Sequence, residues 1–462
     1  MKFSVLDPTE ENIRETLLND QLGRNEELRQ FVRLLNSIDC NCTIALDGDW
    51  GSGKTFFVKQ AQMIIDSFNE YKNKKAISEK DEENIKMVKD KFSDLGIKLQ
   101  ATAYYDAWEN DNEDDPLLSI LYSIISTADC DKDFFKQQKP NALLKSIANT
   151  ITTKAFGTSS KDWLEALSRE DIFKDLKQHK TLRENVTEFL NELIPVGSTR
   201  LVIFIDELDR CKPSYAVKML ERIKHFFSNE NIIFVFAINS FELQNTIKQY
   251  YGSSFNAYQY LDRFFDLRVE LRDIDINKFI EVQGIWTYNE YDQHMDICYS
   301  ADRAIARHFK FKMRTIDRFF KQVKILQNNV LQKRNFYNTN QEYKAYCFLA
   351  IFVTPILVAL KLYNINDYRE LTNGNRSELF IDICRSYNTS EFIKDKFKEL
   401  LGLNNENGIE VFENNCFFIY DYIFQNRQRS FYEEIGLCRF TDNMINNFNS
   451  ELSILSRLSN FE

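Results

Sequence analysis

The residues with the clearest chemical meaning lie in a glycine-rich stretch near the start of the chain. Residues 48–55 read GDWGSGKT, a full match to the pattern G-x-x-x-x-G-K-[ST]. Glycines let successive backbone N–H groups turn inward around a phosphate, and a helix N-terminus behind them adds a favourable dipole. This stretch therefore predicts a phosphate-binding loop, called the phosphate loop below. Its expected contacts come from Gly48, Asp49, Trp50, Gly51, Ser52, Gly53, Lys54, Thr55 and Phe56.

Two side chains of this loop and two acids further along the chain form a candidate site for a nucleoside triphosphate. Lys54 would reach the β and γ phosphates, and Thr55 would ligate Mg²⁺ through its hydroxyl. In the stretch 201–213 (LVIFIDELDRCKP), five apolar residues are followed directly by Asp206. Because parallel strands deliver their carboxyl ends to one crevice, we expect Asp206, on a neighbouring strand, to stand beside the loop and hold Mg²⁺. Glu207 would deprotonate the attacking water, although an acid pair there is also a common helix N-cap.

Three polar side chains near these acids have more than one interpretation. Asp209 and Arg210 form either a structural ion pair or a contact with a neighbouring subunit. Asn239 ends the apolar run IFVFAINS, where its amide would polarise the attacking water or touch the γ phosphate. The alternative for Asn239 is a cap on a helix that begins at Ser240.

Charge that develops on the γ phosphate in the transition state calls for a cation beyond Lys54 and Mg²⁺. The candidates are Arg263 in YLDRFF and the pair Arg314 and Arg318 in MRTIDRFF. Arg314 and Arg318 are four residues apart, so they share a helix face. The pair would contact a nucleotide in its own chain or one bound by a neighbour, and the alternative is a merely solvated pair.

Residues 310–334 hold eight Lys or Arg against one Asp, within an otherwise acidic protein. A basic helix of this kind tracks a nucleic-acid backbone or is simply an exposed face. We favour the exposed face, because the same stretch offers an apolar side for burial at Phe311, Ile316, Phe319, Phe320 and Val323. The acidic run at 109–115 has five acids in seven residues and is expected to be a solvated loop, not a metal site.

The elements that must position these residues follow from hydrophobic spacing. Continuous apolar runs joined by helices are typical of a parallel sheet covered on both faces. We expect strands at 43–46, 97–105, 201–205 and 232–238, a helix or helix pair over 12–35, and only helices after about 272. The predicted fold is α/β, with a three-layer P-loop NTPase core, a helical insertion and a C-terminal helical region. The expected divisions are residues 1–109 (N-terminal helices and first half of the core), 110–198 (insertion), 199–271 (second half of the core) and 272–462 (helical lid and C-terminal helices).

Composition supports a folded, soluble protein. The 462 residues include 69 acidic and 59 basic ones, for a formal charge of −10, and 44% are hydrophobic. The nine cysteines and the polar start of the chain predict free thiols, no secretory signal and a cytoplasmic location. The longest uncharged stretch, residues 345–360, is 16 residues long and contains Pro355. A membrane span needs about 20 residues, so we expect a buried core helix here and no membrane span.

The chain resembles the KAP P-loop NTPases. The resemblance rests on GDWGSGKTFF, on YYDAWENDNEDDPL at 104–117, on FIDELDRCKPSYAVKMLERIKHFF at 204–227, on NIIFVFAIN and on YLDRFFDLRVEL at 260–271, and it covers roughly residues 12–335. It implies a P-loop core of the additional-strand, catalytic-glutamate type, a large insertion before the acid strand and a helical lid after the core.

The chain departs from the usual pattern of that family in three places. Many members carry transmembrane helices in the insertion, but here its longest uncharged stretch, 116–128, is too short to span a membrane. Glu207 replaces the commoner Asp, which leaves a carboxylate in place. Asn239 stands where an Asp is frequent, which weakens its expected role as a sensor of the γ phosphate.

The predicted function is a Mg²⁺-dependent ATPase in which water attacks the γ phosphate with Glu207 as base. ATP is preferred over GTP because no N/T-K-x-D-like guanine signature follows a core strand. We expect turnover to act as a switch for oligomerisation or partner engagement, with a homo-oligomer or a complex with other defence-operon proteins as the assembly. The resemblance implies a role in bacterial defence against phage.

Two alternatives remain at the level of sequence. One is a nucleotide-stabilised scaffold with little turnover, whose residues 272–462 recruit an effector or nucleic acid. The other is a nucleic-acid motor that binds DNA or RNA through residues 310–334.

Overall fold

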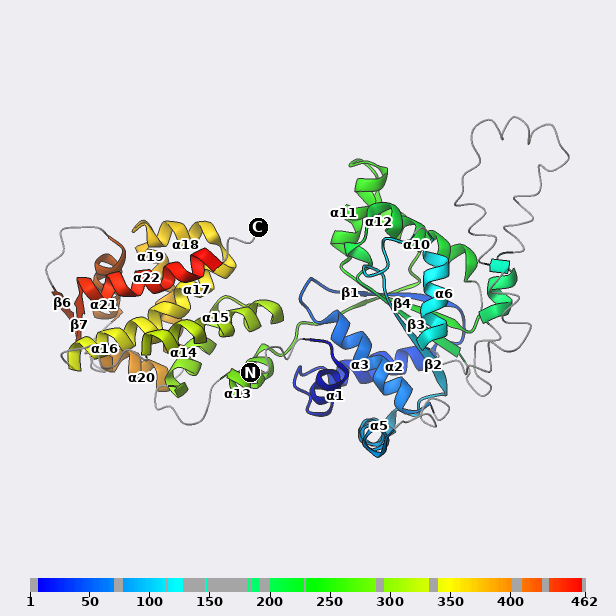
Figure 1. The fold of residues 1–462 in the computed structure, drawn as a ribbon, viewed down its shortest axis with the longest axis horizontal. Coiled ribbons are helices and arrows are strands. Elements are labelled where there is room, and N and C mark those ends of the chain that lie inside the picture. Colours follow the sequence, from blue (N-terminus) through cyan, green and yellow to red (C-terminus); the bar gives the residue numbers. More distant parts are fainter. Residues whose placement is uncertain are drawn as a thin grey trace. The chain divides into compact units, whose positions relative to one another are not determined.

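The computed structural model describes residues 7–69, 78–113, 115–127, 146–147, 182, 184–190, 200–227, 230–287, 295–331, 340–389, 391–400, 409–425 and 432–458 (Figure 1). The chain forms two compact units, residues 8–275 and residues 276–462 with 1–7. They are called the N-terminal unit (residues 8–275) and the C-terminal unit below. The boundary between the units falls after residue 275, four residues beyond the end of the core predicted from the sequence, residue 271.

The N-terminal unit is built on a five-stranded parallel sheet with the order β2-β3-β4-β1-β5. Its central strands β3 and β4 are buried at every position, which explains their uninterrupted apolar sequences. All five strands end at the same edge, called the carboxyl edge below, and begin at the opposite amino edge. The strands are β1 (Cys42–Asp47), β2 (Gln100–Asp106), β3 (Arg200–Asp206), β4 (Ile232–Ile238) and β5 (Leu267–Glu270).

The strand order corrects one expectation and confirms another. β4 lies between β1 and β3, so the acid strand is not the immediate neighbour of the strand before the phosphate loop, as the sequence analysis assumes. This inserted strand is what the resemblance to additional-strand P-loop cores implies. The edge strand β5 was not assigned from sequence, because its four residues are mostly exposed and carry no continuous apolar run.

Helices cover both faces of this sheet, because successive side chains of a strand point to opposite faces. On one face, strand residues such as Ile44 and Val235 share a hydrophobic cluster with four helices. These are α1 (Glu10–Leu18), α2 (Asn25–Ser37), α3 (Lys54–Ser67) and α5 (Glu79–Lys91). On the other face, Ile203 and Phe234 belong to a second cluster. Its helices are α6 (Pro116–Thr127), α10 (Pro213–Phe226), α11 (Ser240–Tyr251) and α12 (Ala257–Leu261). The result is the three-layer core predicted from sequence (Figure 1).

Most of the predicted insertion, residues 110–198, lies outside the described residues. Within it, α6 and residues 184–190 are helical, in agreement with the amphipathic spacing there. Leu182, Val186 and Phe189 are buried in the same cluster as α6.

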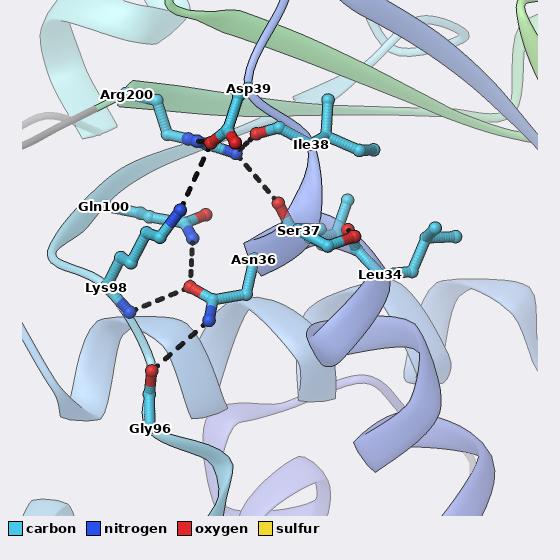
Figure 2. A network of polar contacts seen from close by, with 10 residues as sticks. Leu34, Asn36, Ser37, Ile38, Asp39, Gly96, Lys98, Gln100 and Arg200 are labelled. Atoms are coloured by element: carbon cyan, nitrogen blue, oxygen red, sulfur yellow. Dashed lines mark hydrogen bonds and ion pairs between the residues drawn. The ribbon is translucent and has the colours of Figure 1, made fainter.

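A polar network at the amino edge joins the end of α2 to the starts of β2 and β3 (Figure 2). The guanidinium of Arg200 donates to the carbonyl of Leu35 at 3.0 Å and to the carboxylate of Asp39 at 2.9 Å, and it also bonds the carbonyl of Ile38. The Oδ1 of Asn36 accepts from the backbone N–H of Lys98 at 2.8 Å and from the side chain of Gln100 at 3.2 Å. The buried arginine therefore satisfies carbonyls at the end of α2 that have no partner within the helix.

The C-terminal unit is mainly helical, as expected, but it also contains a hairpin that the sequence analysis misses. β6 (Tyr432–Ile435) pairs antiparallel with β7 (Cys438–Thr441). The strands have four residues each, too few to show a clear period, and Gly436 turns the chain with φ of 62°. The helices are α13 (Ile276–Thr287), α14 (Met295–His308), α15 (Met313–Leu331), α16 (Asn340–Phe348), α17 (Thr354–Tyr363), α18 (Ile365–Thr372), α19 (Ser377–Cys384), α20 (Glu391–Leu400), α21 (Ile409–Phe424) and α22 (Asp442–Leu458), with a π-helical turn at Leu349–Val353 and a 3₁₀ turn at Arg385–Thr389.

The apolar segment of this unit is a core helix. Among the described residues, Asn340–Tyr363 is the one helix long and apolar enough to cross a membrane, and 89% of its most apolar window is buried inside the structure. Pro355 lies in the first turn of α17, directly after the π-helical turn. The carbonyl of Leu349 accepts both the backbone N–H of Thr354 and its hydroxyl, the latter at 3.0 Å, so the residue before the proline closes the π-helical turn with two hydrogen bonds.

Candidate active site

The phosphate loop connects β1 to α3 at the carboxyl edge, and the shape of its backbone favours glycine at two positions. Gly51 and Gly53 have φ of 78° and 89°, a region that other residues rarely adopt. A Cβ on Gly48 would lie 2.9 Å from the hydroxyl oxygen of Ser52. The N–H of Gly48 donates to the carbonyl of Ile238 at 3.1 Å, which fixes the start of the loop to the end of β4.

Lys54 is the first residue of α3, and its ammonium group lies against the loop. Nζ donates to the carbonyls of Gly48, at 2.6 Å, and Asp49, at 3.1 Å. Burial lowers the pKa of Lys54, while the carboxylates of Asp209, Asp206 and Glu207 act in the opposite direction. The loop cation therefore interacts with the acids that follow β3.

Asp206 and Thr55 meet across the intervening strand. The Asp206 carboxylate accepts hydrogen bonds from the Thr55 hydroxyl, from the Tyr104 hydroxyl at 3.1 Å and from the backbone N–H of Glu207 at 2.9 Å. Asp206 is 1% exposed. Burial raises its pKa, and these three bonds counteract that effect because they favour the carboxylate. A hydroxyl and a carboxylate oxygen side by side are the hard ligands that Mg²⁺ prefers.

Glu207 has an unusual backbone and a dedicated partner. Its φ is 62°, a left-handed conformation that is costly for a residue with a Cβ and that tends to persist at functional sites. Its carboxylate pairs with the guanidinium of Arg210, whose centre lies 5.5 Å from the ring centroid of Trp108. Burial raises the pKa of Glu207 to about 7, helped by the charge of Asp206 and opposed by Arg210.

Asp209 and Arg210 do not pair with each other, in contrast to one of the two interpretations from sequence. The 3₁₀ turn Leu208–Arg210 sends them in different directions. Arg210 turns back to Glu207, whereas Asp209 accepts a hydrogen bond from the indole N–H of Trp50 at 2.6 Å. The phosphate loop and the acid strand are thus joined directly. The sequence carried no signal for this bond, because its two partners are 159 residues apart.

Asn239 lies at the carboxyl edge, as predicted, where it caps α11. Its Oδ1 accepts from the backbone N–H groups of Phe241, at 3.1 Å, and Glu242, at 3.2 Å. The carboxylate of Asp47, the last residue of β1, accepts from the N–H of Ser240 at 2.8 Å. The side-chain oxygen of Asn239 therefore caps α11, as one of the two interpretations predicts. A contact between its amide nitrogen and the γ phosphate stays a prediction.

Arg263 is not brought to the phosphate loop of its own chain, so an intrachain role for it is wrong. It is exposed and lies between α12 and the start of β5, at the amino edge. Its carbonyl accepts from Lys224, near the end of α10, at 2.8 Å. The nearby N–H of Asp266 donates to the carbonyl of Thr43, near the start of β1, at 2.8 Å. The phosphate loop follows the opposite, carboxyl end of β1, so Arg263 and the loop lie at opposite edges of the sheet.

Arg314 and Arg318 are exposed on α15 in the C-terminal unit, so no contact with the loop is assigned to them. The opposite side of this helix is buried at every position that the sequence analysis names, which supports the exposed-face interpretation of the basic stretch. Lys321 of the same helix pairs with Asp317 at 2.6 Å.

The residues at the carboxyl edge fit a nucleoside triphosphate with Mg²⁺. Three glycines leave room for backbone N–H groups to approach a phosphate, and Lys54 supplies a cation. Within the described part of the chain, the hydroxyl of Ser52 is buried without a hydrogen-bond partner, so it is available to bond a ligand in the loop. Thr55 and Asp206 supply hard oxygen ligands.

Comparisons with known proteins agree with this geometry. An uncharacterised protein of Methanocaldococcus jannaschii is 29% identical over 151 residues, which make up 32% of this chain and 68% of that protein. The model of the KAP family P-loop domain matches residues 24–330. That match includes the phosphate loop, all five strands of the sheet and Glu207, and it covers more than half of the chain. The chain therefore belongs to the KAP family of P-loop domain proteins, which are nucleotide-binding NTPases.

Proposed function

We propose that this protein is a Mg²⁺-dependent ATPase whose nucleotide state acts as a switch for self-association or partner engagement in the cytoplasm. The observation that carries the proposal is the hydrogen bond from Trp50 to Asp209 at 2.6 Å, which joins the phosphate loop to the turn after the acid strand, beside the approach of Thr55 to Asp206. Lys54 and Glu207 are the adjacent residues in the two segments. Cation, metal ligands and base thus belong to one site at the carboxyl edge.

Each residue has a distinct role in the proposed reaction. The loop amides and Lys54 bind the β and γ phosphates, and Thr55 and Asp206 hold the metal. Bound Mg²⁺ would neutralise charge on the phosphates. Glu207 accepts a proton from the attacking water through its carboxylate, and its pKa of about 7 suits a base at neutral pH.

Hydrolysis assays on three variants test this assignment. Lys54→Ala should abolish ATP binding, whereas Glu207→Gln should bind ATP and lose at least about 100-fold in turnover, as expected for loss of a general base. Lys86→Ala, an exposed lysine on α5, is the matched control and should behave as wild type. Titration with GTP and omission of Mg²⁺ test the preference for ATP and the metal. Retained binding by Lys54→Ala would reject the site.

A specific contact favours the second candidate function, a nucleotide-stabilised scaffold with little turnover. Glu207 is engaged by Arg210, so the base must leave an ion pair before it reaches water. Under this alternative, wild type and Glu207→Gln hydrolyse ATP at the same slow rate while both bind it. A clear difference between their rates supports the ATPase.

Self-association is supported by the position of Arg263. Because this exposed arginine lies at the amino edge, it is available to a nucleotide only in another copy of the chain. We expect Arg263→Ala and Lys54→Ala each to be inactive alone and a mixture of the two to regain activity. Measurement of mass with and without ATP tests the assembly itself. No recovery in the mixture would exclude catalysis by Arg263 in a neighbouring copy.

Partner engagement is the less constrained part of the proposal. The resemblance to bacterial KAP proteins supports a complex with other proteins of a defence operon, and plating of phage on cells with wild type or Lys54→Ala tests it. Nucleic-acid binding through residues 310–334 stays a prediction, which is compatible with the exposure of Arg314 and Arg318. ATPase activity that DNA or RNA stimulates at low salt, and that Arg314→Ala with Arg318→Ala abolishes, would support that binding.

A further inference from the structure

Arg24 is a buried cation next to the phosphate loop with no role in the reaction described above. It precedes the first residue of α2, and its side chain is 3% exposed. Burial lowers its pKa to about 10, with Glu27 and Asp273 acting in the opposite direction, so the guanidinium is still charged at neutral pH. A buried charge is retained in a fold only where it is paired or hydrogen-bonded.

Its first partner is the phosphate loop. Nη1 of Arg24 donates to the carbonyl of Ser52 at 2.9 Å. In a trans peptide the C=O and the following N–H point in opposite directions, so this bond turns the N–H of Gly53 away from Arg24. Gly53 is the left-handed residue immediately before α3, where an inward N–H is needed to bind phosphate. Arg24 therefore fixes the orientation of a phosphate-binding amide without touching phosphate.

Its second partner is the segment 271–275, which leads out of the N-terminal unit. Nη2 of Arg24 bonds the carbonyl of Arg272, and the N–H of Arg272 donates to Glu27 at 2.9 Å. Nε of Arg24 lies 3.6 Å from the carboxylate of Glu27. The same segment also borders the loop, because the N–H of Leu271 donates to the carbonyl of Asp47, the residue before Gly48, at 2.8 Å. One side chain thus holds the loop and the exit segment together.

We propose that Arg24 is a positioning residue that couples the phosphate loop to segment 271–275, so that nucleotide in the loop changes the state of the chain leading to the C-terminal unit. This inference rests on the proposed function, because it needs a nucleotide in the loop. A guanidinium has separate N–H groups for two carbonyls in a fixed fork, whereas a lysine ammonium is a single point of attachment. Arg24→Lys therefore keeps the positive charge but weakens the hydrogen bond to one of the two carbonyls, that of Ser52 or that of Arg272.

The test combines calorimetric titration with ATP and Mg²⁺ and hydrogen exchange of the full-length chain. The reporters are the N–H groups of Leu271, Arg272 and Asp275, which donate to Asp47, Glu27 and Leu22. In wild type, ATP should slow exchange in both the loop and these three residues. Arg24→Lys and Arg24→Gln should bind ATP about 10-fold more weakly, the effect of one lost charge-assisted hydrogen bond. At saturating ATP, exchange should still slow in their loops but not at residues 271–275.

The matched control is Arg29→Lys. Arg29 lies on the same helix and donates to the carbonyl of Lys91 at 2.7 Å, but it is bonded to the end of α5 and not to the loop. It should keep wild-type affinity and protection at 271–275. Wild-type affinity in Arg24→Lys, or undiminished protection at 271–275, would overturn this inference alone. If wild type fails to bind nucleotide, the proposed function falls with it.

Discussion

At the scale of single residues, Glu207 is held in a left-handed backbone and in an ion pair with Arg210. A base must be deprotonated to act, so its pKa of about 7 predicts turnover that falls as the pH drops below that value. Arg210 favours the ionised carboxylate and so lowers this pKa. Loss of Arg210 removes that effect and also frees the carboxylate to turn toward water.

We therefore predict that Arg210→Gln shifts the acidic limb of the pH–rate profile to higher pH. The measurement is kcat against pH for wild type and variant under saturating ATP. Arg222→Gln serves as the control, since Arg222 pairs with Asp115 instead of Glu207. An acidic limb that stays in place would show that Arg210 does not set the charge state of the base.

The bond between Trp50 and Asp209 yields a second prediction at this scale. Asp209 is buried, and among the described residues its Oδ1 has no hydrogen-bond partner, so loss of the indole donor leaves the carboxylate poorly satisfied. Trp50→Phe should lower the free energy of unfolding by about 1 to 3 kcal/mol, the cost of a buried polar group left unpaired. A double-mutant cycle with Asp209→Asn measures the coupling by urea unfolding.

Trp108→Phe is the control for that cycle. The Trp108 ring is about half exposed and contacts Arg210 through its face, so replacement by phenylalanine should cost less than Trp50→Phe. Additive effects of Trp50→Phe and Asp209→Asn would contradict a direct link between loop and acid strand.

At the scale of elements, Arg200 predicts a stability effect that is separate from catalysis. Its removal leaves the carbonyls of Leu35 and Ile38 without their buried donor. Arg200→Ala should reduce the free energy of unfolding by about 3 kcal/mol, as for other broken buried networks. The urea midpoint measures this loss, while nucleotide affinity should change little because the network lies at the amino edge.

Lys98→Ala tests whether burial is the reason. Lys98 reaches Asp39 at 3.2 Å in the same network but is exposed, so its loss should cost no more than about 1 kcal/mol. Equal losses for Arg200→Ala and Lys98→Ala would indicate that burial of the arginine is not decisive.

The elements also show which features the sequence can predict. The phosphate loop, the acid strand and the layers of the core followed from local signals, namely a glycine pattern and apolar runs. The place of β4 between β1 and β3 was implied only by the family, because pairing order is a long-range property. Arg24 and Arg200 were missed since both bind backbone carbonyls, and a carbonyl leaves no trace in the residue types. The hairpin at 432–441 was missed because its strands are shorter than the window in which a period can be recognised.

At the scale of the whole molecule, the two compact units allow nucleotide binding to be read by calorimetry. A ligand that binds only the folded state stabilises it by about 2.7 kcal/mol at 100 times its dissociation constant. We predict that ATP with Mg²⁺ raises the unfolding temperature of the transition that belongs to residues 8–275. Lys54→Ala should abolish the shift, and Lys86→Ala should retain it. A shift that survives in Lys54→Ala would place the nucleotide elsewhere.

The opposite placement of the phosphate loop and Arg263 limits the symmetry of any assembly. The loop lies at the carboxyl edge of the sheet and Arg263 at the amino edge. If two copies pack antiparallel, a two-fold dimer makes this contact twice. If the copies stack head to tail, the contact is heterologous and repeats from copy to copy. Such a contact closes into a ring if the rotation between copies allows it and otherwise grows into a helical filament. In the filament, one terminal chain would keep its phosphate loop without an arginine from a neighbour.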